Sequence, residues 1–550
     1  MAMKVVIIGG VASGMSAAAR LRRLDESSEI TVYEMSENVS YANCGLPYFV
    51  SDVISKRDAL LLQTPEALWN RFRIKAQVSS MVTSIDRASK TVSVKNLVTG
   101  DTFEDSYDKL VIATGARPRH LDLPGIERAM WLRNVTDADT VKNSLLTAEN
   151  KTVAIIGAGF IGIELAENIR HLDISVTIIQ RSNSILGQFD PEMVQPLHDV
   201  LVKHGVQIEL NAQVEKITKT HVVLTDGRKI DAGLVFTAAG VEPDNALARA
   251  AGLKIGETGG LWVDEQQRTS DPDIFAAGDA VEKNGVLTGK QTLVPLANLA
   301  NRHGRLIADV IAGREVSAHA AVGTVILGAF GFAVGITGIS EKAAIKAGIA
   351  HQIIHVHPNN HAGYYPGAKR LSLKLLFDPA TGQILGAQAN GEDGVDKRID
   401  VIATAMHTNA GRGGLNIEDL MDLELAYAPQ FGSAKDAINI AGYVGNNVFG
   451  GMTPTLQWHE LESARAAGAQ VIDVRSPQEH GHAHIPGTVS IPVEKLRDRL
   501  DEIKLEDVVV YCQVGQRGHI ATQILKAAGA NVRNLDGGFV TWSAGTAAVS

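Results

Sequence analysis

Cysteine is almost absent from this sequence, because its 550 residues include only Cys44 and Cys512. Two cysteines cannot form a disulfide framework, so we expect a reducing compartment and a cytoplasmic protein. Positive net charge is absent too, and the value of −9 argues against a general nucleic-acid binder. No secretory signal is visible, because Gly9 and Gly10 interrupt the apolar run at residues 5–8.

One long stretch lacks charge altogether, since residues 316–340 contain no Asp, Glu, Lys or Arg. That length could span a bilayer. Five glycines between Gly323 and Gly338 suit two buried strands joined by a turn better than a lipid-facing helix. We therefore predict a hairpin here and no membrane association. The whole chain is too long for one hydrophobic core, and three or four domains are expected.

Two glycine turns, 148 residues apart, have the same surroundings. The first, residues 9–14, follows a strand at residues 4–8 and opens a helix that runs to about Leu24; the next strand, residues 30–33, ends at Glu34. The pattern is that of a βαβ unit.

The second turn, residues 157–162, follows a strand at residues 152–156 and opens a helix to about His171; the next strand, residues 175–179, ends at Gln180. The sequence therefore predicts two dinucleotide-binding folds in one chain.

A glycine turn that opens a helix aims backbone N–H groups at a pyrophosphate, and an acid at the end of the next strand binds ribose hydroxyls. In the first turn Val11 replaces the middle glycine, so Gly10 is expected to make the close approach to the ligand. In the second, Gln180 replaces the acid that favours NADH, and Arg181 could hold a 2′-phosphate, so we predict that NADPH is accepted and leave NADH open as a second donor. The predicted nucleotide-binding residues are Gly9, Gly10, Gly14, Glu34, Gly157, Gly159, Gly162, Gln180 and Arg181.

Two further turns, residues 113–115 and 277–279, complete a resemblance to the pyridine nucleotide-disulfide oxidoreductase superfamily. Most disulfide reductases of that superfamily have a C-x4-C pair, whereas residues 40–48 hold Cys44 alone and are similar to the coenzyme A-disulfide reductase branch. The resemblance covers residues 1 to about 445. It implies FAD and NAD(P)H as cofactors, with further flavin contacts from Thr114, Gly115, Gly278, Asp279, Pro295 and Ala297.

A lone reactive cysteine has a mechanistic consequence, because its oxidised form needs an outside partner such as a mixed disulfide with a small thiol, or a sulfenic acid. Cys44 precedes Gly45, Leu46 and Pro47, which indicate a helix start. The N-terminus of that helix is expected to lower the pKa of the Cys44 thiol.

In the resembling branch the thiol partner is coenzyme A, whose phosphates require cations. We expect the phosphates and the pantetheine arm to be bound by Arg20, Arg22, Arg23, Arg71, Ser40, Asn43 and Gln63. Tyr365 and Tyr427 resemble two tyrosines that reach the thiol site from a partner subunit, so a homodimer is implied; a phenol there could protonate a leaving thiolate.

Two alternatives remain open at this stage. One is an NADH oxidase or peroxidase that cycles its cysteine as a sulfenic acid; those enzymes place a histidine in the first glycine turn, where this chain has Ala12. The other is a flavin-containing redox sensor or sulfur carrier with little turnover.

The last hundred residues resemble a rhodanese domain, because three segments match in order: residues 473–477, 484–488 and 511–518. Cys512 follows a strand, and a loop of backbone N–H groups would stabilise its thiolate and hold a persulfide anion. The loop consists of Gln513, Val514, Gly515, Gln516 and Arg517. Cysteine phosphatases have one residue more between the cysteine and the arginine, which disfavours that reading.

The predicted fold class is α/β, with two Rossmann-like domains, an α+β dimerisation domain and a rhodanese-like α/β domain. The predicted ranges are 1–115 with 245–321 for FAD, 116–244 for NAD(P), 322–445 for dimerisation and 455–550 for the rhodanese, with residues 442–454 as a linker. The expected reaction is the NAD(P)H-dependent reduction of coenzyme A persulfide, polysulfide or coenzyme A disulfide through Cys44, with Cys512 supplying sulfur. No metal site is predicted.

Overall fold

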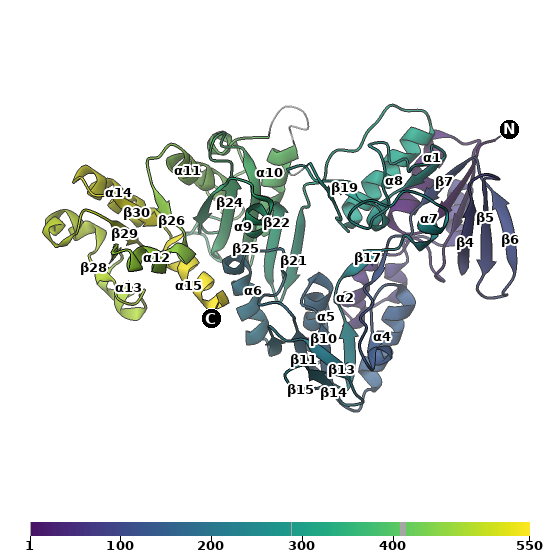
Figure 1. Ribbon diagram of the computed structural model, residues 1–550, viewed down its shortest axis with the longest axis horizontal. Coiled ribbons are helices and arrows are strands. Elements are labelled where there is room, and N and C mark those ends of the chain that lie inside the picture. The colour runs from purple at the N-terminus through teal and green to yellow at the C-terminus, as the bar shows by residue number, and fades with distance from the viewer. Residues whose placement is uncertain (1, 288, 408–413, 550) are drawn as a thin grey trace. The chain divides into compact units, whose positions relative to one another are not determined.

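The structure is a computed structural model that describes residues 2–287, 289–407 and 414–549 (Figure 1). Contacts within the chain divide it into two compact units. The first unit comprises Met1–Arg181 and Gly205–Ala321, and the second comprises Ser182–His204 and Val322–Ser550.

The first unit contains a parallel five-stranded sheet in the order β18-β7-β1-β2-β3. Along β1, Val5 and Ile7 enter one hydrophobic core while Val6 and Ile8 enter another, so helices and loops cover both faces of the sheet. The strands are β1 (Lys4–Ile8), β2 (Glu29–Tyr33), β3 (Ile74–Gln77), β7 (Lys109–Ile112) and β18 (Ile274–Ala276), and the helices α1 (Ala12–Leu24) and α8 (Ala297–Ile311) pack against each other. The predicted strands and helix around the first glycine turn are confirmed.

A second parallel sheet in the same unit has the order β12-β11-β10-β16-β9. Its strands are β9 (Ala129–Met130), β10 (Thr152–Ile156), β11 (Ser175–Ile179), β12 (Val206–Glu209) and β16 (Leu234–Thr237), with helices α4 (Val135–Thr147) and α5 (Phe160–Arg170). The second predicted βαβ unit is therefore confirmed as well.

Smaller elements complete the first unit. Two antiparallel three-stranded sheets consist of β4 (Ser80–Asp86), β5 (Thr91–Asn96) and β6 (Thr102–Ser106), and of β13 (Val214–Ile217), β14 (His221–Leu224) and β15 (Lys229–Asp231). The two-stranded pairs are β8 (Ala116–Pro118) with β17 (Val241–Pro243), and β19 (Lys283–Asn284) with β20 (Gln291–Thr292). Three short helices are α2 (Leu46–Val50), α3 (Pro65–Phe72) and α7 (Ala246–Ala250).

The second unit begins with an antiparallel sheet in the order β21-β22-β25-β24-β23. Its strands are β21 (Val325–Ala329), β22 (Phe332–Gly338), β23 (Gln352–Val356), β24 (Leu371–Phe377) and β25 (Ile384–Gly391), and its helices are α6 (Pro191–Lys203), α9 (Glu341–Ala347), α10 (Val395–His407) and α11 (Ala437–Phe449). The hairpin of β21 and β22 confirms the expectation for the uncharged stretch. Among the described residues, no helix is long and apolar enough to cross a membrane.

The predicted linker at residues 442–454 is wrong over most of its length, because α11 continues to Phe449. Two of its four glycines, Gly442 and Gly445, permit close packing inside the helix. A Cβ atom on Gly445 would lie 2.2 Å from Cγ1 of Ile417, and one on Gly442 would lie 2.7 Å from the backbone nitrogen of Met421. Residues 450–454 make the connection.

The rest of the second unit is a parallel sheet in the order β26-β30-β29-β27-β28. The strands are β26 (Thr455–Leu456), β27 (Gln470–Asp473), β28 (Val489–Ser490), β29 (Val508–Tyr511) and β30 (Val532–Leu535); the helices are α12 (Leu461–Ala466), α13 (Pro477–His482), α14 (Gln516–Ala527) and α15 (Gly538–Val549). Cys512 directly follows β29, as predicted.

Candidate functional site: two nucleotide cradles and two cysteines

The first glycine turn joins β1 to α1 in a conformation that needs glycine. Gly9 has φ +102°, and a Cβ atom there would lie 2.2 Å from the carbonyl oxygen of Ala113. Glu34 is buried at the end of β2, and its Oε2 accepts a hydrogen bond of 2.7 Å from the N–H of Gly10. A Cβ atom on Gly10 would lie 2.7 Å from Cγ2 of Val39, so protein fills the space on that side of Gly10. This disagrees with our expectation that Gly10 makes the close approach to the ligand.

The second turn repeats this geometry with one difference. Oε1 of Gln180, at the end of β11, accepts a hydrogen bond of 3.0 Å from the N–H of Ala158, just as Glu34 does in the first fold. A Cβ atom on Gly162 would lie 2.1 Å from the carbonyl oxygen of Gly157, whereas one on Gly159 would meet no atom within 4 Å. Open space at Gly159 fits the close approach of a pyrophosphate to the backbone. Arg181 is exposed directly after Gln180.

One buried carboxylate oxygen in the first unit has no hydrogen-bond partner. Asp279 lies in the turn after β18, and its Oδ1 makes no hydrogen bond although it is buried. Burial raises the pKa of Asp279, and the nearby Lys283 opposes this. Buried carboxylate oxygens are nearly always hydrogen-bonded in native proteins, so this atom fits a hydroxyl group of a bound ligand. Together with the two glycine turns, it fits FAD and a second nucleotide.

The other predicted flavin contacts lie in the same unit. Oγ1 of Thr114 donates a hydrogen bond of 2.6 Å to the carbonyl oxygen of Asp244, and Gly115 has φ +72°. Pro295 precedes α8, and Ala297 is its first residue. Their roles toward a flavin stay predictions.

Cys44 lies on a cavity of about 490 Å³ in the first unit. Five residues that we assigned to coenzyme A, namely Arg23, Ser40, Asn43, Gln63 and Arg71, line it together with Val11, Ala12, Met15, Ser16, Ala19, Tyr41, Ala42, Leu62, Leu68, Phe72, Ala297 and Asn301. The thiol is exposed to solvent, and both arginines are exposed at the cavity. An exposed thiol beside two cations suits a thiol ligand that carries anionic groups.

Two of the predicted phosphate ligands have other partners. Arg22 is 4% exposed, and its guanidinium donates five hydrogen bonds to backbone carbonyl oxygens, two of them at 2.7 Å to Phe72 and Ser28. Arg20 pairs with Asp309 at 2.7 Å. The assignment of Arg22 to coenzyme A is therefore wrong, because that side chain fastens the end of α1 to the loops around it. Neither Arg20 nor Arg22 lines the cavity.

The expected lowering of the Cys44 pKa is wrong for this chain without its ligands. The predicted helix does begin at Leu46, but α2 has only five residues. Cys44 reaches solvent at the cavity, but the protein around it partly desolvates the sulfur. This partial desolvation is the first cause that raises the pKa of the thiol, and the carboxylates of Glu164 and Asp279 raise it further. Glu164 itself has its pKa raised to about 7 by burial and by Glu167. No motif singles out Glu164 beyond its place in the helix after the second glycine turn.

The two predicted tyrosines lie in the second unit on an exposed aromatic surface. Tyr365 is 41% and Tyr427 50% exposed, and the hydroxyl of Tyr427 lies 3.1 Å from that of Tyr364. Phe431 is exposed close by in sequence. Their action at a thiol site stays a prediction.

Cys512 is buried, 1% exposed, and its loop closes around the sulfur. The N–H of Gly515 donates a hydrogen bond of 3.1 Å to Sγ of Cys512. Arg517 is held by Glu479 through two hydrogen bonds of 2.6 and 2.7 Å. Arg475 donates a bond of 3.0 Å to Oε1 of Gln513. The contacts of Arg475 and Glu479 were not predicted. Arg475 belongs to the segment 473–477 of the rhodanese resemblance, and Glu479 lies two residues after it.

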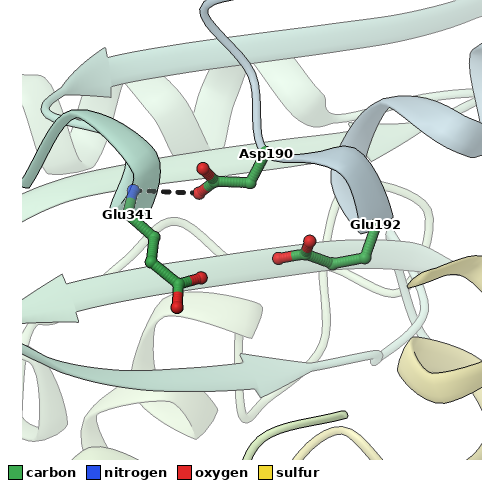
Figure 2. A group of neighbouring side chains, drawn as sticks. All are labelled: Asp190, Glu192 and Glu341. Atoms are coloured by element: carbon green, nitrogen blue, oxygen red, sulfur yellow. Dashed lines mark hydrogen bonds between the residues drawn. The ribbon is translucent and has the colours of Figure 1, made fainter. Parts of the chain in front are cut away.

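Asp190, Glu192 and Glu341 form an acidic cluster in the second unit (Figure 2). The cation among them is the ammonium group of the buried Lys374, at 2.9, 2.5 and 2.6 Å from the three carboxylates in turn. Burial opposes the charge of Lys374, but these carboxylates outweigh it and raise the pKa of the ammonium. The cluster is thus a set of ion pairs whose centre is already occupied by a lysine.

Comparison with known proteins agrees with this architecture. Residues 3–304 match the family described as pyridine nucleotide-disulphide oxidoreductase, residues 327–437 its dimerisation domain, and residues 457–545 the rhodanese-like domain. A coenzyme A disulfide reductase from Staphylococcus epidermidis is 31% identical over 441 residues, which cover 80% of this chain and 99% of the relative.

Two solved structures resemble the whole chain. The reduced CoADR-RHD of Bacillus anthracis has a TM-score of 0.97 and 41% identity, covering 100% of this chain and 99% of its own. An NAD-dependent persulfide reductase from A. fulgidus has a TM-score of 0.91 and 35% identity, covering 98% and 100%. The chain therefore belongs to the pyridine nucleotide-disulphide oxidoreductase family, as an FAD-dependent NAD(P)H oxidoreductase that ends in a rhodanese-like domain.

Proposed function

We propose that the protein reduces coenzyme A persulfide, and also coenzyme A disulfide, through Cys44, and that its rhodanese-like domain supplies the sulfur. The observation that carries the proposal is a single exposed thiol on a cavity rimmed by Arg23 and Arg71, in a chain whose other cysteine lies in a separate persulfide loop. The names of the relatives from S. epidermidis and A. fulgidus support the same substrate classes.

The residues of the first unit have distinct tasks in this reaction. Arg23 and Arg71 bind the phosphates of coenzyme A, while Ser40, Asn43 and Gln63 hold its pantetheine arm against the cavity wall. The glycine turns with Glu34, and with Gln180 and Arg181, bind FAD and NAD(P)H respectively. FAD, when bound, accepts hydride from NAD(P)H and delivers an electron pair to sulfur.

The covalent step uses Cys44 as the nucleophile. Its thiolate attacks the inner sulfur of coenzyme A persulfide, the S–S bond breaks, and hydrosulfide leaves while a Cys44–coenzyme A disulfide forms. Two electrons then cleave this disulfide and restore the Cys44 thiolate and the coenzyme A thiolate. In sum, NAD(P)H, one proton and coenzyme A persulfide give NAD(P)+, coenzyme A and hydrogen sulfide.

Cys512 carries the sulfur before this step. Its thiolate attacks the outer sulfur of a sulfane donor, the donor's bond to that sulfur breaks, and the rest of the donor leaves as an anion. The loop N–H groups and Arg517 stabilise the Cys512 persulfide; coenzyme A thiolate then attacks its outer sulfur, and the Cys512 thiolate leaves. The exposed tyrosines Tyr364, Tyr365 and Tyr427 suit contact with a second copy of the chain, so the active form is proposed to be a homodimer in which Tyr365 and Tyr427 reach the thiol site of the partner.

The test is release of hydrogen sulfide from NAD(P)H and coenzyme A persulfide, followed with wild type and Cys44→Ser under anaerobic conditions. We expect one sulfide per NAD(P)H oxidised by wild type and none above background by Cys44→Ser. Oxidation of NAD(P)H that requires oxygen and releases no sulfide would instead support the oxidase alternative. Stoichiometric oxidation without turnover would support the sensor.

A further inference from the structure

Backbone hydrogen bonds from the segment that follows β30 hold the persulfide loop, residues 512–517, in place. The N–H groups of Phe539 and Val540 donate hydrogen bonds of 2.8 and 3.1 Å to the carbonyl oxygens of Cys512 and Gln513. A Cβ atom on Gly538 would lie 2.4 Å from the carbonyl oxygen of Cys512. The position of the loop backbone therefore depends directly on where this segment, residues 536–541, is placed.

The other side of the same segment is held by two histidines at the end of β23, an edge strand of the dimerisation-domain sheet. Nδ1 of His355 lies 2.6 Å from Oδ2 of Asp536, and the backbone N–H of His355 donates to Oδ1 at 3.2 Å. Nε2 of His357 lies 2.8 Å from Oγ1 of Thr541. A Cβ atom on Gly537 would lie 2.7 Å from Cβ of His355, so the segment 536–541 and strand β23 are in close contact.

His355 is in turn fixed on its far side. It is 2% exposed, and its Nε2 lies 3.2 Å from Oε1 of Glu192, which α6 provides and which also pairs with Lys374. Burial opposes a charge on this imidazole, but Asp536 and Glu192 outweigh it and raise the pKa of His355 to about 9. The ionisable groups around His355 are Asp536, Glu192, the neighbouring His357 and, beyond Glu192, Lys374. α15, which begins at Gly538, packs against the same helix α6 (Figure 1).

We propose that His355 is a positioning residue for sulfur transfer: through Asp536 it fixes the segment whose N–H groups set the conformation of the Cys512 loop. The inference rests on the sulfur-transfer role proposed for Cys512. On this proposal the dimerisation domain is part of the rhodanese site, because the Cys512 loop takes its active conformation only while residues 536–541 are in contact with β23. A buried hydrogen bond between ionised groups has both the strength and the geometric specificity for this.

Two substitutions separate the two contacts of the imidazole. In His355→Asn the amide nitrogen stands near the place of Nδ1 and keeps the bond to Asp536. In His355→Gln it stands near the place of Nε2 and keeps the bond to Glu192. Both variants lose the positive charge of the imidazole and place a neutral amide in the same buried site. Each is therefore the control for the effect of losing that charge in the other.

The measurement is transfer of sulfur from thiosulfate to cyanide by the full-length holoenzyme. Thiosulfate gives its outer sulfur to Cys512 and leaves as sulfite; cyanide removes that sulfur as thiocyanate and restores the thiolate. We expect His355→Gln to lower kcat by about tenfold, as one lost positioning contact would, and His355→Asn to recover most of it. Reduction of coenzyme A disulfide, which uses Cys44, should be equal in all three proteins. Equal transfer by wild type and His355→Gln would overturn the proposal, as would equal loss in both variants.

A second pair keeps the test decisive if the histidine variants fold poorly. Asp536→Asn removes the charge that His355 binds in a buried ion pair, whereas Asp507→Asn breaks a more exposed ion pair with Arg533, 2.7 Å long, elsewhere in the same domain and so controls for the loss of one carboxylate. Hydrogen exchange of the peptide covering residues 512–518 should rise in Asp536→Asn and stay unchanged in Asp507→Asn; equal exchange would contradict the proposal. If wild type transfers no sulfur, the role of Cys512 fails, and the exchange measurement still decides whether His355 and Asp536 position the loop.

Discussion

The two cysteines of this chain stand in opposite surroundings. Cys512 is buried in a loop whose own backbone N–H and arginine face the sulfur. Cys44 reaches solvent at an open cavity, but partial desolvation by the surrounding protein and two carboxylates raise the pKa of its thiol. The groups that stabilise an anion at Cys512 thus belong to its own loop, whereas the protein around Cys44 disfavours the thiolate. The loop around Cys512 is therefore prebuilt for an anion, whereas we propose that Cys44 is activated when cofactor and substrate bind.

The largest expected effect separates the two thiols completely. Cys44→Ser should lower NAD(P)H-dependent reduction of coenzyme A disulfide by about a thousandfold or more, because the nucleophile is gone, and should leave thiosulfate–cyanide transfer intact. Cys512→Ser should do the reverse. Each variant is the control for the other, with both activities assayed on the same preparations. A double loss in either variant would mean that the two sites do not act separately.

The next effect concerns the open cavity. Arg71→Ala should raise KM for coenzyme A disulfide by about tenfold with little change in kcat, because a cation that binds phosphate contributes equally before and during reaction. Arg117→Ala is the matched control, since Arg117 is an exposed arginine that pairs with Glu242 away from the cavity. Dephosphorylated coenzyme A disulfide should show a smaller difference between wild type and Arg71→Ala. An unchanged KM in Arg71→Ala would show that Arg71 does not bind coenzyme A disulfide.

A smaller effect tests the support of the Cys512 loop through pH. The pKa of His355 is raised from 6.5 to about 9, so its charge stabilises the folded state fully below pH 6.5, and this contribution is lost as the pH rises through 9. Wild type should therefore exceed His355→Asn in melting temperature by a few degrees at pH 6, and the gap should shrink by pH 9.5. Scanning calorimetry across this range measures it. A gap that grows with pH would contradict the charged histidine.

The smallest expected effect is a shift at Cys44 alone. Glu164→Gln should move the midpoint of the pH profile for Cys44 alkylation downward, because it removes a carboxylate that raises the pKa of the thiol. Alkylation of Cys512 in the same sample is the internal control and should keep its profile. A midpoint that stays in place would show that Glu164 does not act on the thiol.

Local sequence patterns predicted the elements whose conformation depends on residues adjacent in the sequence. The strands and helices around both glycine turns are correct, because a β-branched run, a glycine turn and a helical run follow one another directly in the sequence. The prediction for Arg22 failed because only tertiary packing shows that backbone carbonyl oxygens surround its guanidinium. The linker prediction failed at Gly442 and Gly445, where glycine permits close packing that no local pattern reveals.

The parts that join distant segments could not be predicted. Glu164 reaches Cys44 from a different nucleotide-binding fold, so the direction of the thiol pKa depends on a helix far along the chain. The bond between His355 and Asp536 joins two domains that match two separate families. Neither residue stands in a motif that singles it out, and only the folded chain brings the two together.

The most direct test of the account is intact-protein mass spectrometry of the oxidised holoenzyme after incubation with coenzyme A disulfide. We predict one coenzyme A bound by a disulfide at Cys44, none at Cys512, and loss of this adduct when one equivalent of NAD(P)H is added. A protein that carries no coenzyme A, or carries it at Cys512 while Cys44 stays free, would contradict the account.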